Sequence, residues 1–164
     1  MADNKISWAT PDLLDDNPGK AQVVELQFQS FGQHSAFSGP CHTIHCIEDN
    51  TLVGKTLRGP GNGRVLVVNG EGSMRRALLG DMLAEAAIAN NWQGVVVNGC
   101  IRDVDPINSM AIGVKALGTN PMKTDKLDGG ESGIKIVIGN AVINDGDYIY
   151  ADNNGVIVSH TKLD

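Results

Sequence analysis

The stretch RVLVVNGEGSMRRALLGDMLAEAAIANNWQGVVVNGCIRD, residues 64–103, decides the fold expected for this chain. It begins with a continuous apolar run at residues 64–68, which is typical of a strand buried on both faces. A helix is expected over residues 82–90, and a second buried strand over residues 94–97. Because a helix links two buried strands, the stretch predicts an α/β protein in which a helix start and a strand end share one cleft.

The segments on either side of this stretch are expected to form short helices, strands and turns. Thr10 is placed as the N-cap of a helix with Pro11 at its first position, and Ser73 as the cap of a helix that Gly80 interrupts. Further helices are expected over residues 50–57 and 106–110, strands over residues 23–28, 41–47, 111–117, 134–138, 141–143, 147–151 and 156–159, and loops over residues 31–40 and 119–133. The pattern predicts an α/β middle and a β-rich tail in one mixed sheet with helices packed on it.

Size and charge limit the classes of protein to which this chain can belong. With 164 residues, the chain is expected to form a single domain over residues 1–164. Its 20 glycines and 4% aromatic content suit a compact α/β protein with many tight turns. The net charge of −6 leaves no basic stripe, so direct binding to nucleic acid is not expected.

The sequence contains no segment that indicates a membrane or secreted protein. Residues 1–10 lack the basic and apolar regions of a secretory signal, and no apolar run is long enough to span a bilayer. Cys41, Cys46 and Cys100 are an odd number of cysteines without the spacing of a disulfide framework. Reduced thiols in the cytoplasm are therefore expected.

Gly80, Asp81, Met82 and Leu83 form the first candidate for a binding site. If a helix begins here, its first backbone amides lack partners inside the helix, and the positive end of the helix dipole favours an anion. Gly80 would let a ligand approach the backbone, and Asp81 could both cap the helix and touch a water bound to a metal. A kinked helix with an ordinary cap is the simpler alternative for these four residues.

Arg102 and Asp103 form the second candidate, because they follow the buried strand at residues 94–97 and its glycine turn. Ligands of α/β proteins usually bind just past the carboxyl ends of such strands. A guanidinium suits a carboxylate or a developing oxyanion, and a carboxylate suits a hard cation such as Mg²⁺, which keeps most of its waters. The alternative is a surface pair that caps the next turn, with Asp105 as a competing or supporting acid.

Seven segments match one known family, and together they extend over nearly the whole chain. These segments are Val24-Glu25, Phe31-Gly32, Phe37-Ser38-Gly39, Arg64-Val65-Leu66-Val67-Val68, Gly72-Ser73-Met74-Arg75-Arg76-Ala77-Leu78, Gly99-Cys100-Ile101-Arg102 and Tyr150-Ala151-Asp152-Asn153-Asn154-Gly155. The chain resembles the family of regulator of ribonuclease activity A (RraA) and the class II 4-hydroxy-4-methyl-2-oxoglutarate aldolases. The resemblance implies a single-domain swivelling β/β/α sandwich with a mixed central sheet, assembled as a homotrimer with active sites near the subunit contacts.

The aldolases of this family carry a motif of one acidic residue, twenty spacers and then Arg-Asp, which Asp81, Arg102 and Asp103 fill without a gap. The resemblance implies that the backbone amides of residues 80–83 bind the substrate carboxylate and that Arg102 binds substrate oxygens. It also implies that Asp103 holds a divalent cation, Mg²⁺ or Mn²⁺. Members specialised for ribonuclease regulation can lack the acid after the arginine, so Asp103 favours the enzyme.

The resemblance therefore implies a metal-dependent aldolase that cleaves 4-hydroxy-4-methyl-2-oxoglutarate to two pyruvates. Oxaloacetate decarboxylation is expected as a side reaction because it passes through the same enolate. The rival prediction is a protein that binds and inhibits ribonuclease E or the RNA degradosome, since an acidic trimer could contact basic, RNA-binding segments. A third alternative is a relic scaffold with negligible turnover.

Two further motifs are expected to be structural. The segment CHTIHC, residues 41–46, has zinc-like spacing, but alternate residues of a strand point to opposite faces, so its four ligands would not converge. Residues 69–72 faintly resemble a nucleotide-binding loop, yet Arg75 stands where a dinucleotide fingerprint needs glycine, and the Walker lysine is absent. A methyltransferase or a dehydrogenase is therefore not expected.

Overall fold

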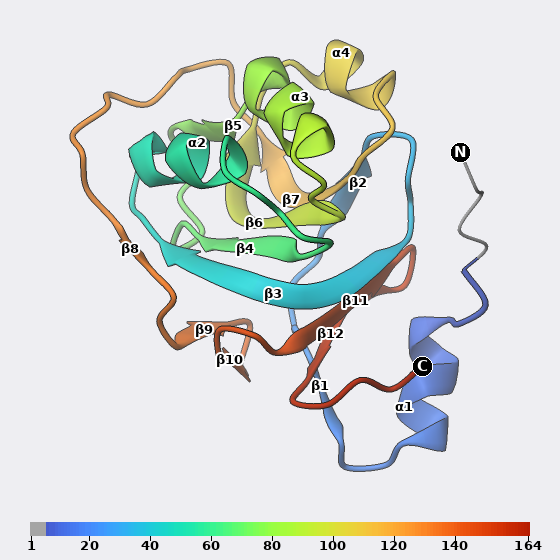
Figure 1. Cartoon of the computed structure of the whole chain (residues 1–164). Helices are drawn as coiled ribbons and strands as arrows, with labels where there is room; N and C mark the ends of the chain where they lie inside the picture. The colour runs from blue at the N-terminus through green and yellow to red at the C-terminus, as the bar shows by residue number, and fades with distance from the viewer. Residues whose placement is uncertain (1–5) are drawn as a thin grey trace.

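The computed structural model describes residues 6–164 and shows helices packed on one face of a large mixed sheet (Figure 1). The sheet has ten strands in the order β1-β12-β11-β3-β4-β6-β7-β2, with β5 paired to β6 and β8 paired to β3. The strands of this sheet are β1 (Ala21–Val23), β2 (Gln29–Phe31), β3 (Phe37–His45), β4 (Val65–Asn69), β5 (Ala77–Leu79), β6 (Gly94–Ile101), β7 (Gly113–Thr119), β8 (Glu131–Ser132), β11 (Tyr148–Asp152) and β12 (Gly155–Ser159). The predicted α/β class with a mixed central sheet is confirmed.

Four parallel strands, β3, β4, β6 and β7, form the part of the sheet that positions the candidate site. Every residue of β4 and β6 is buried, which explains their continuous apolar sequence. The connections between these strands contain α2 (Thr51–Leu57), α3 (Asp81–Ala89) and α4 (Val104–Asn108), and all three helices cover the same face (Figure 1). Because the strands are parallel, their carboxyl ends meet at one edge of the sheet.

A second β layer covers the face of the parallel strands that the helices leave free (Figure 1). β3 belongs to both layers, since residues 41–45 pair with β4 and residues 37–40 pair with β11. The hairpin of β9 (Ile136–Ile138) and β10 (Ala141–Ile143) lies on the same side, and its buried side chains join those of β11 and β12 in one apolar cluster. The helices, the parallel strands and the second β layer give the β/β/α arrangement that the family resemblance implies.

Three predicted elements differ from the structure. The helix expected from Ser73 is wrong: residues 77–79 form β5, because these three buried residues pair with β6. The strand expected over residues 23–28 is wrong except at Val23, the last residue of β1, because residues 24–28 are irregular and β2 begins only at Gln29. The loop expected over residues 31–40 is too long, since β3 already begins at Phe37.

The N-terminal helix α1 (Thr10–Asp16) is present, but its predicted cap is wrong. Ala9 occupies the N-cap position, and Thr10 is the first helical residue. The hydroxyl of Thr10 donates instead to Asp152 at 2.8 Å, which ties α1 to the end of β11. The predicted hairpins β9–β10 and β11–β12 are confirmed. Within residues 6–164, no helix has the length and apolar character needed to cross a membrane.

Candidate active site

A short parallel pairing between β5 and β6 brings the two candidate groups together. Leu79 of β5 is the register partner of Ile101 of β6, and the backbone amide of Arg102 donates to the carbonyl of Leu79 at 2.9 Å. β5 leads through Gly80 into α3, and β6 leads through Arg102 and Asp103 into α4. The start of α3 and the end of β6 therefore lie side by side.

The contact that defines the site joins Asp103 to the first turn of α3. The backbone amide of Asp81 donates to Oδ2 of Asp103 at 3.0 Å. Gly80 is the N-cap of α3, and a Cβ atom at this position would lie 2.7 Å from the same carboxylate oxygen. A side chain at position 80 would therefore displace the carboxylate of Asp103 from the end of the helix.

Carboxylates of the chain itself occupy part of the amide-rich end of α3. Asp81 is the first helical residue rather than the expected N-cap, and its Oδ1 accepts a hydrogen bond from the amide of Met82 at 2.8 Å. The carboxylate of Asp103 accepts the hydrogen bond from the amide of Asp81, whereas the amide of Leu83 has no acceptor among residues 6–164. These contacts show that the helix end attracts anionic groups, as its unpaired amides and its dipole dictate.

The backbone of Asp103 is left-handed, with φ 58° and ψ 45°, at the N-cap position of α4. Its side chain makes no capping hydrogen bond to α4 and binds α3 instead. Aspartate tolerates this conformation better than most residues, but positive φ is uncommon outside glycine and tends to occur at functional sites. The conformation directs the carboxylate away from its own helix and toward the shared cleft.

A pocket of about 260 Å³ lies beside this contact. It is lined by Arg102, Asp103, Val104, Thr119, Asn120 and Pro121. Nη1 of Arg102 donates to the carbonyl of Pro121 at 3.4 Å. Arg102 forms no ion pair with any of residues 6–164, so its remaining N–H groups are available to a ligand.

Three pocket residues could not be identified from the sequence. They belong to residues 119–133, for which a long loop without a defined role is expected. Thr119, Asn120 and Pro121 lie at the carboxyl end of β7, next to the end of β6. The available signal is that polar residues follow two buried strands in succession. Nothing in the sequence states, however, that these two strands are neighbours in the sheet.

The donor atoms of the pocket fit a hard, mostly hydrated cation. Asp103 is the only carboxylate among the lining residues, and the described part of the chain contains no group of three His, Cys, Asp or Glu side chains placed to bind one ion. Mg²⁺ and Mn²⁺ accept one or two carboxylates and several waters, whereas zinc requires three or four protein ligands. Asp103 is therefore the residue that would hold such a cation.

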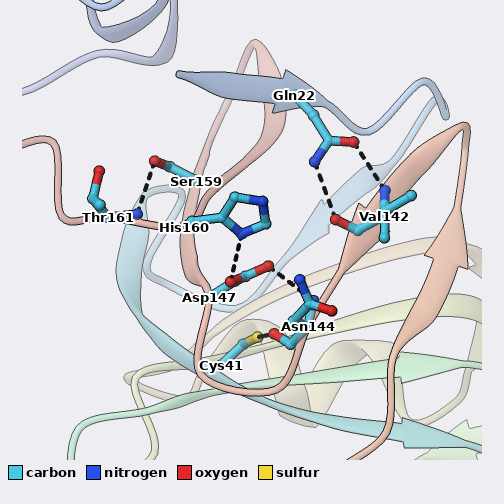
Figure 2. Close-up of polar contacts among 8 residues, drawn as sticks. All are labelled: Gln22, Cys41, Val142, Asn144, Asp147, Ser159, His160 and Thr161. Carbon is cyan, nitrogen blue, oxygen red and sulfur yellow. Dashed lines mark hydrogen bonds and ion pairs between the residues drawn. The ribbon is translucent and has the colours of Figure 1, made fainter. Parts of the chain in front are cut away.

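The zinc-like segment at residues 41–46 has a structural role. The thiol of Cys41 donates to the carbonyl of Asn144 at 3.4 Å, in the turn that precedes β11 (Figure 2). Burial raises the pKa of the Cys41 and Cys46 thiols to about 12, so both remain protonated near neutral pH. Among residues 6–164, no three His, Cys, Asp or Glu side chains are placed to bind one ion, so this segment does not form the metal site that its spacing suggests.

The glycine-rich loop at residues 69–72 is closed to a phosphate. The backbone amides of Gly70 and Gly72 both donate to the carbonyl of Asn98, at 3.1 and 3.2 Å. A phosphate-binding loop needs such amides free at the start of a helix. The next element is the strand β5, so neither requirement is met.

The fold and the pocket define an α/β protein with a small pocket at the carboxyl ends of parallel strands, the place where ligands of such proteins usually bind. The RraA-like family, described as Aldolase/RraA, matches residues 10–158. The chain therefore belongs to this family, which confirms the family predicted from its sequence.

Individual relatives match almost the whole chain. A protein from Hahella chejuensis (strain KCTC 2396), named "Putative 4-hydroxy-4-methyl-2-oxoglutarate aldolase", is 53% identical over 158 residues, which cover 96% of each chain. The structure of S-adenosylmethionine: 2-dimethylmenaquinone methyltransferase from Geobacillus kaustophilus HTA426 has a TM-score of 0.92 at 44% identity, covering 95% of this chain and 97% of that one. The RNA-processing inhibitor RraA from Thermus thermophilis has a TM-score of 0.93 at 35% identity, covering 97% of this chain and 96% of that one.

Proposed function

We propose that this chain is a class II, divalent-metal-dependent aldolase that cleaves 4-hydroxy-4-methyl-2-oxoglutarate to two pyruvates, with oxaloacetate decarboxylation as a secondary activity. The observation that carries the proposal is the contact between the amide of Asp81 and Oδ2 of Asp103, next to Arg102 and a small pocket. The relative named for this aldolase supports it, because 53% identity extends over 96% of both chains.

Charge complementarity supports a small keto acid with two carboxylates as the substrate. The free N–H groups of Arg102 can form paired hydrogen bonds with carboxylate or alkoxide oxygens. We assign the keto-acid carboxylate to the first amides of α3, residues 80–83, where the dipole and the unpaired amide of Leu83 favour an anion. A volume of about 260 Å³ suits a ligand of this size.

The chemistry requires a group that accepts a proton and groups that stabilise negative charge. A divalent cation held by Asp103 would supply Lewis-acid stabilisation of the charge on the keto-acid fragment. When the C3–C4 bond breaks, its electron pair passes to that fragment, which takes up a proton at C3 to become pyruvate. We assign Arg102 to the oxygen at C4, and Asp81 to orienting the water that accepts the C4 hydroxyl proton.

A methyltransferase like the Geobacillus kaustophilus structure is less well supported. Pockets for drug-sized ligands usually measure about 300–1,000 Å³, and the pocket beside Arg102 is smaller, at about 260 Å³. The glycine-rich loop, which would be the next candidate for a nucleoside cofactor, has its amides bound to the carbonyl of Asn98. Neither place therefore suits S-adenosylmethionine.

Regulation of ribonuclease E or the RNA degradosome is the rival proposal. It rests on the similarity to the Thermus RraA and on the net charge of −6, which would attract basic segments of a partner. The two roles can coexist, because catalysis uses the pocket and docking uses the outer surface. We also propose a homotrimer, from the family resemblance, and a cytoplasmic location, from the three cysteines without the spacing of a disulfide framework.

A coupled assay tests the aldolase proposal directly. The purified chain is mixed with 4-hydroxy-4-methyl-2-oxoglutarate, Mg²⁺ or Mn²⁺, and lactate dehydrogenase, and pyruvate is followed through NADH oxidation. We expect turnover that depends on the cation and stops when a chelator is added. No pyruvate with either cation would contradict the proposal, and a ribonuclease E pull-down with the purified chain would then test the rival.

A further inference from the structure

We propose that Thr119 determines the substrate specificity of this pocket by donating a hydrogen bond from its hydroxyl to the carboxylate on the C4 side of a branched keto acid. The inference rests on the proposed aldolase activity. It adds a residue outside the motif of Asp81, Arg102 and Asp103, from a strand that the motif does not reach.

Strand pairing places Thr119 beside the residues assigned to the reaction. Thr119 is the last residue of β7 and the register partner of Ile101 in β6, so it lies next to the chain that continues into Arg102. The side chain is exposed and lines the pocket. Thr119, Asn120 and Pro121 form one side of the pocket, which we call the β7 wall.

The β7 wall is held in place by hydrogen bonds to the neighbouring strands. The amide of Asn120 donates to the carbonyl of Ile101 at 3.0 Å, and the amide of Ala77 donates to the carbonyl of Met122 at 2.8 Å. The carbonyl of Pro121 accepts a hydrogen bond from Arg102. A donor on this wall is therefore positioned before a ligand binds, which reduces the entropic cost of binding.

Thr119 is the polar side chain of the β7 wall that remains free for a ligand. Nδ2 of Asn120 already donates to the carbonyl of Met74 at 2.7 Å, and its Oδ1 accepts from the amide of Met122 at 2.8 Å. Pro121 presents an apolar ring. The hydroxyl of Thr119, by contrast, makes no hydrogen bond with any residue between 6 and 164.

The chemistry of the substrate indicates which end Thr119 meets. The keto-acid end needs a cation and an anion-binding group, which Asp103 and the amides at the start of α3 would provide, and Arg102 is assigned to the oxygen at C4. The C4 end carries a methyl group and a second carboxylate. A hydroxyl donor suits that carboxylate, and the apolar side chains of Val104 and Pro121 suit the methyl group.

The variant Thr119→Val tests the inference because valine keeps the branched shape and replaces the hydroxyl donor with a methyl group. Loss of a hydrogen bond to a charged group should weaken binding about tenfold or more. We expect KM for 4-hydroxy-4-methyl-2-oxoglutarate to rise by about that factor while kcat changes little, and Thr119→Ser to restore the wild-type value. Thr161→Val, at an exposed threonine outside the pocket lining, should match the wild type.

Oxalate distinguishes recognition of the C4 end from general damage, since it resembles the keto-acid fragment but lacks that end. Calorimetry in the presence of Mg²⁺ should give the same oxalate affinity for the wild type and for Thr119→Val. A parallel loss of oxalate affinity, or an unchanged KM in an active Thr119→Val variant, would overturn the inference. A wild type without turnover would instead overturn the proposed function, so the two failures are distinguishable.

Discussion

The backbone amide of Asp81 donates a hydrogen bond to Oδ2 of Asp103 at 3.0 Å, at the positive end of α3. The carboxylate of Asp103 thus lies where an anionic ligand would also be favoured. If Asp103 holds the cation as well, the cation neutralises the carboxylate next to the amides that receive the substrate. Binding of the cation should then increase the affinity for the keto acid, and binding of the keto acid should increase the affinity for the cation by the same factor.

Replacing Asp103 with alanine should remove metal-dependent activity without unfolding the protein. The half-buried carboxylate is the only one lining the pocket, and losing a group that stabilises developing charge typically reduces turnover by about 10²–10³-fold. The coupled assay measures this loss, and calorimetry should show that Mg²⁺ raises the oxalate affinity of the wild type but not of Asp103→Ala.

Asp105→Ala provides the matched control for this prediction. Asp105 lies two positions further along, in α4, is exposed and does not line the pocket. It should retain wild-type kinetics and the effect of Mg²⁺ on oxalate binding. Full Mg²⁺-dependent activity in Asp103→Ala would refute the assignment of Asp103 to the cation.

Gly80→Ala should impair activity much more than stability. The added Cβ would lie 2.7 Å from Oδ2 of Asp103, so the carboxylate must move, whereas the extended backbone of Gly80, φ −131°, accepts alanine without strain. A displacement of this kind can cost about 10²-fold in turnover. Thermal unfolding with the coupled assay checks the prediction, and a variant as active as the wild type would show that the close approach of Asp103 to α3 is unimportant.

Arg102→Lys should reduce kcat/KM by about 10²-fold, because a lysine ammonium retains the charge but cannot form the paired hydrogen bonds of a guanidinium. Steady-state kinetics with the proposed substrate measures the effect. Arg75→Lys is the control, since the side chain of Arg75 is 79% exposed and binds Glu48 rather than the pocket. If Arg102→Lys and Arg75→Lys both kept the wild-type kcat/KM, the guanidinium of Arg102 would have no specific role in the reaction.

Strong local signals made the middle of the fold predictable, and tertiary pairing made two elements unpredictable. The apolar runs of β4 and β6 could be recognised because every one of their residues is buried. Residues 77–79, by contrast, look helical in sequence and become a strand only because β6 is available beside them. Phe37 likewise begins β3 within a glycine- and serine-rich segment, because residues 37–40 pair with β11 from the far end of the chain.

The candidate site was predictable where it depends on sequence spacing and unpredictable where it depends on sheet order. The spacing from Asp81 to Arg102 and Asp103 indicated that a helix start and a strand end would meet, and the structure places them together. The left-handed backbone of Asp103 has no sequence signature, since asparagine, aspartate and glycine all tolerate it. Thr119 was missed because its place beside Arg102 depends on the pairing of β6 with β7.

Asp49 should contribute to stability in a pH-dependent way, because its buried carboxylate fixes the long segment after β7 to the start of α2. Oδ1 accepts hydrogen bonds from Thr51, and Oδ2 accepts them from the amides of Leu127 and Gly129, at 3.2 and 2.9 Å. Burial opposes the charge of this carboxylate, but the hydrogen bonds from Thr51, Gly129 and Leu127 outweigh it and lower the pKa of Asp49. The folded state therefore holds this proton less tightly than the unfolded chain.

Asp49→Asn should accordingly destabilise the protein by about 1–3 kcal/mol near pH 7, because the amide group presents a donor in place of one acceptor oxygen and leaves partly buried N–H groups without that acceptor. The stabilisation from the lowered pKa is complete above the ordinary aspartate value of 3.8 and is lost as the pH falls through the folded-state pKa. Urea unfolding from pH 7 to pH 3 should thus show the difference between wild type and Asp49→Asn shrinking in acid. Asp125→Asn, an exposed acid in the same segment, should show neither effect. A difference that stays constant with pH would mean that the charge of Asp49 does not stabilise the fold.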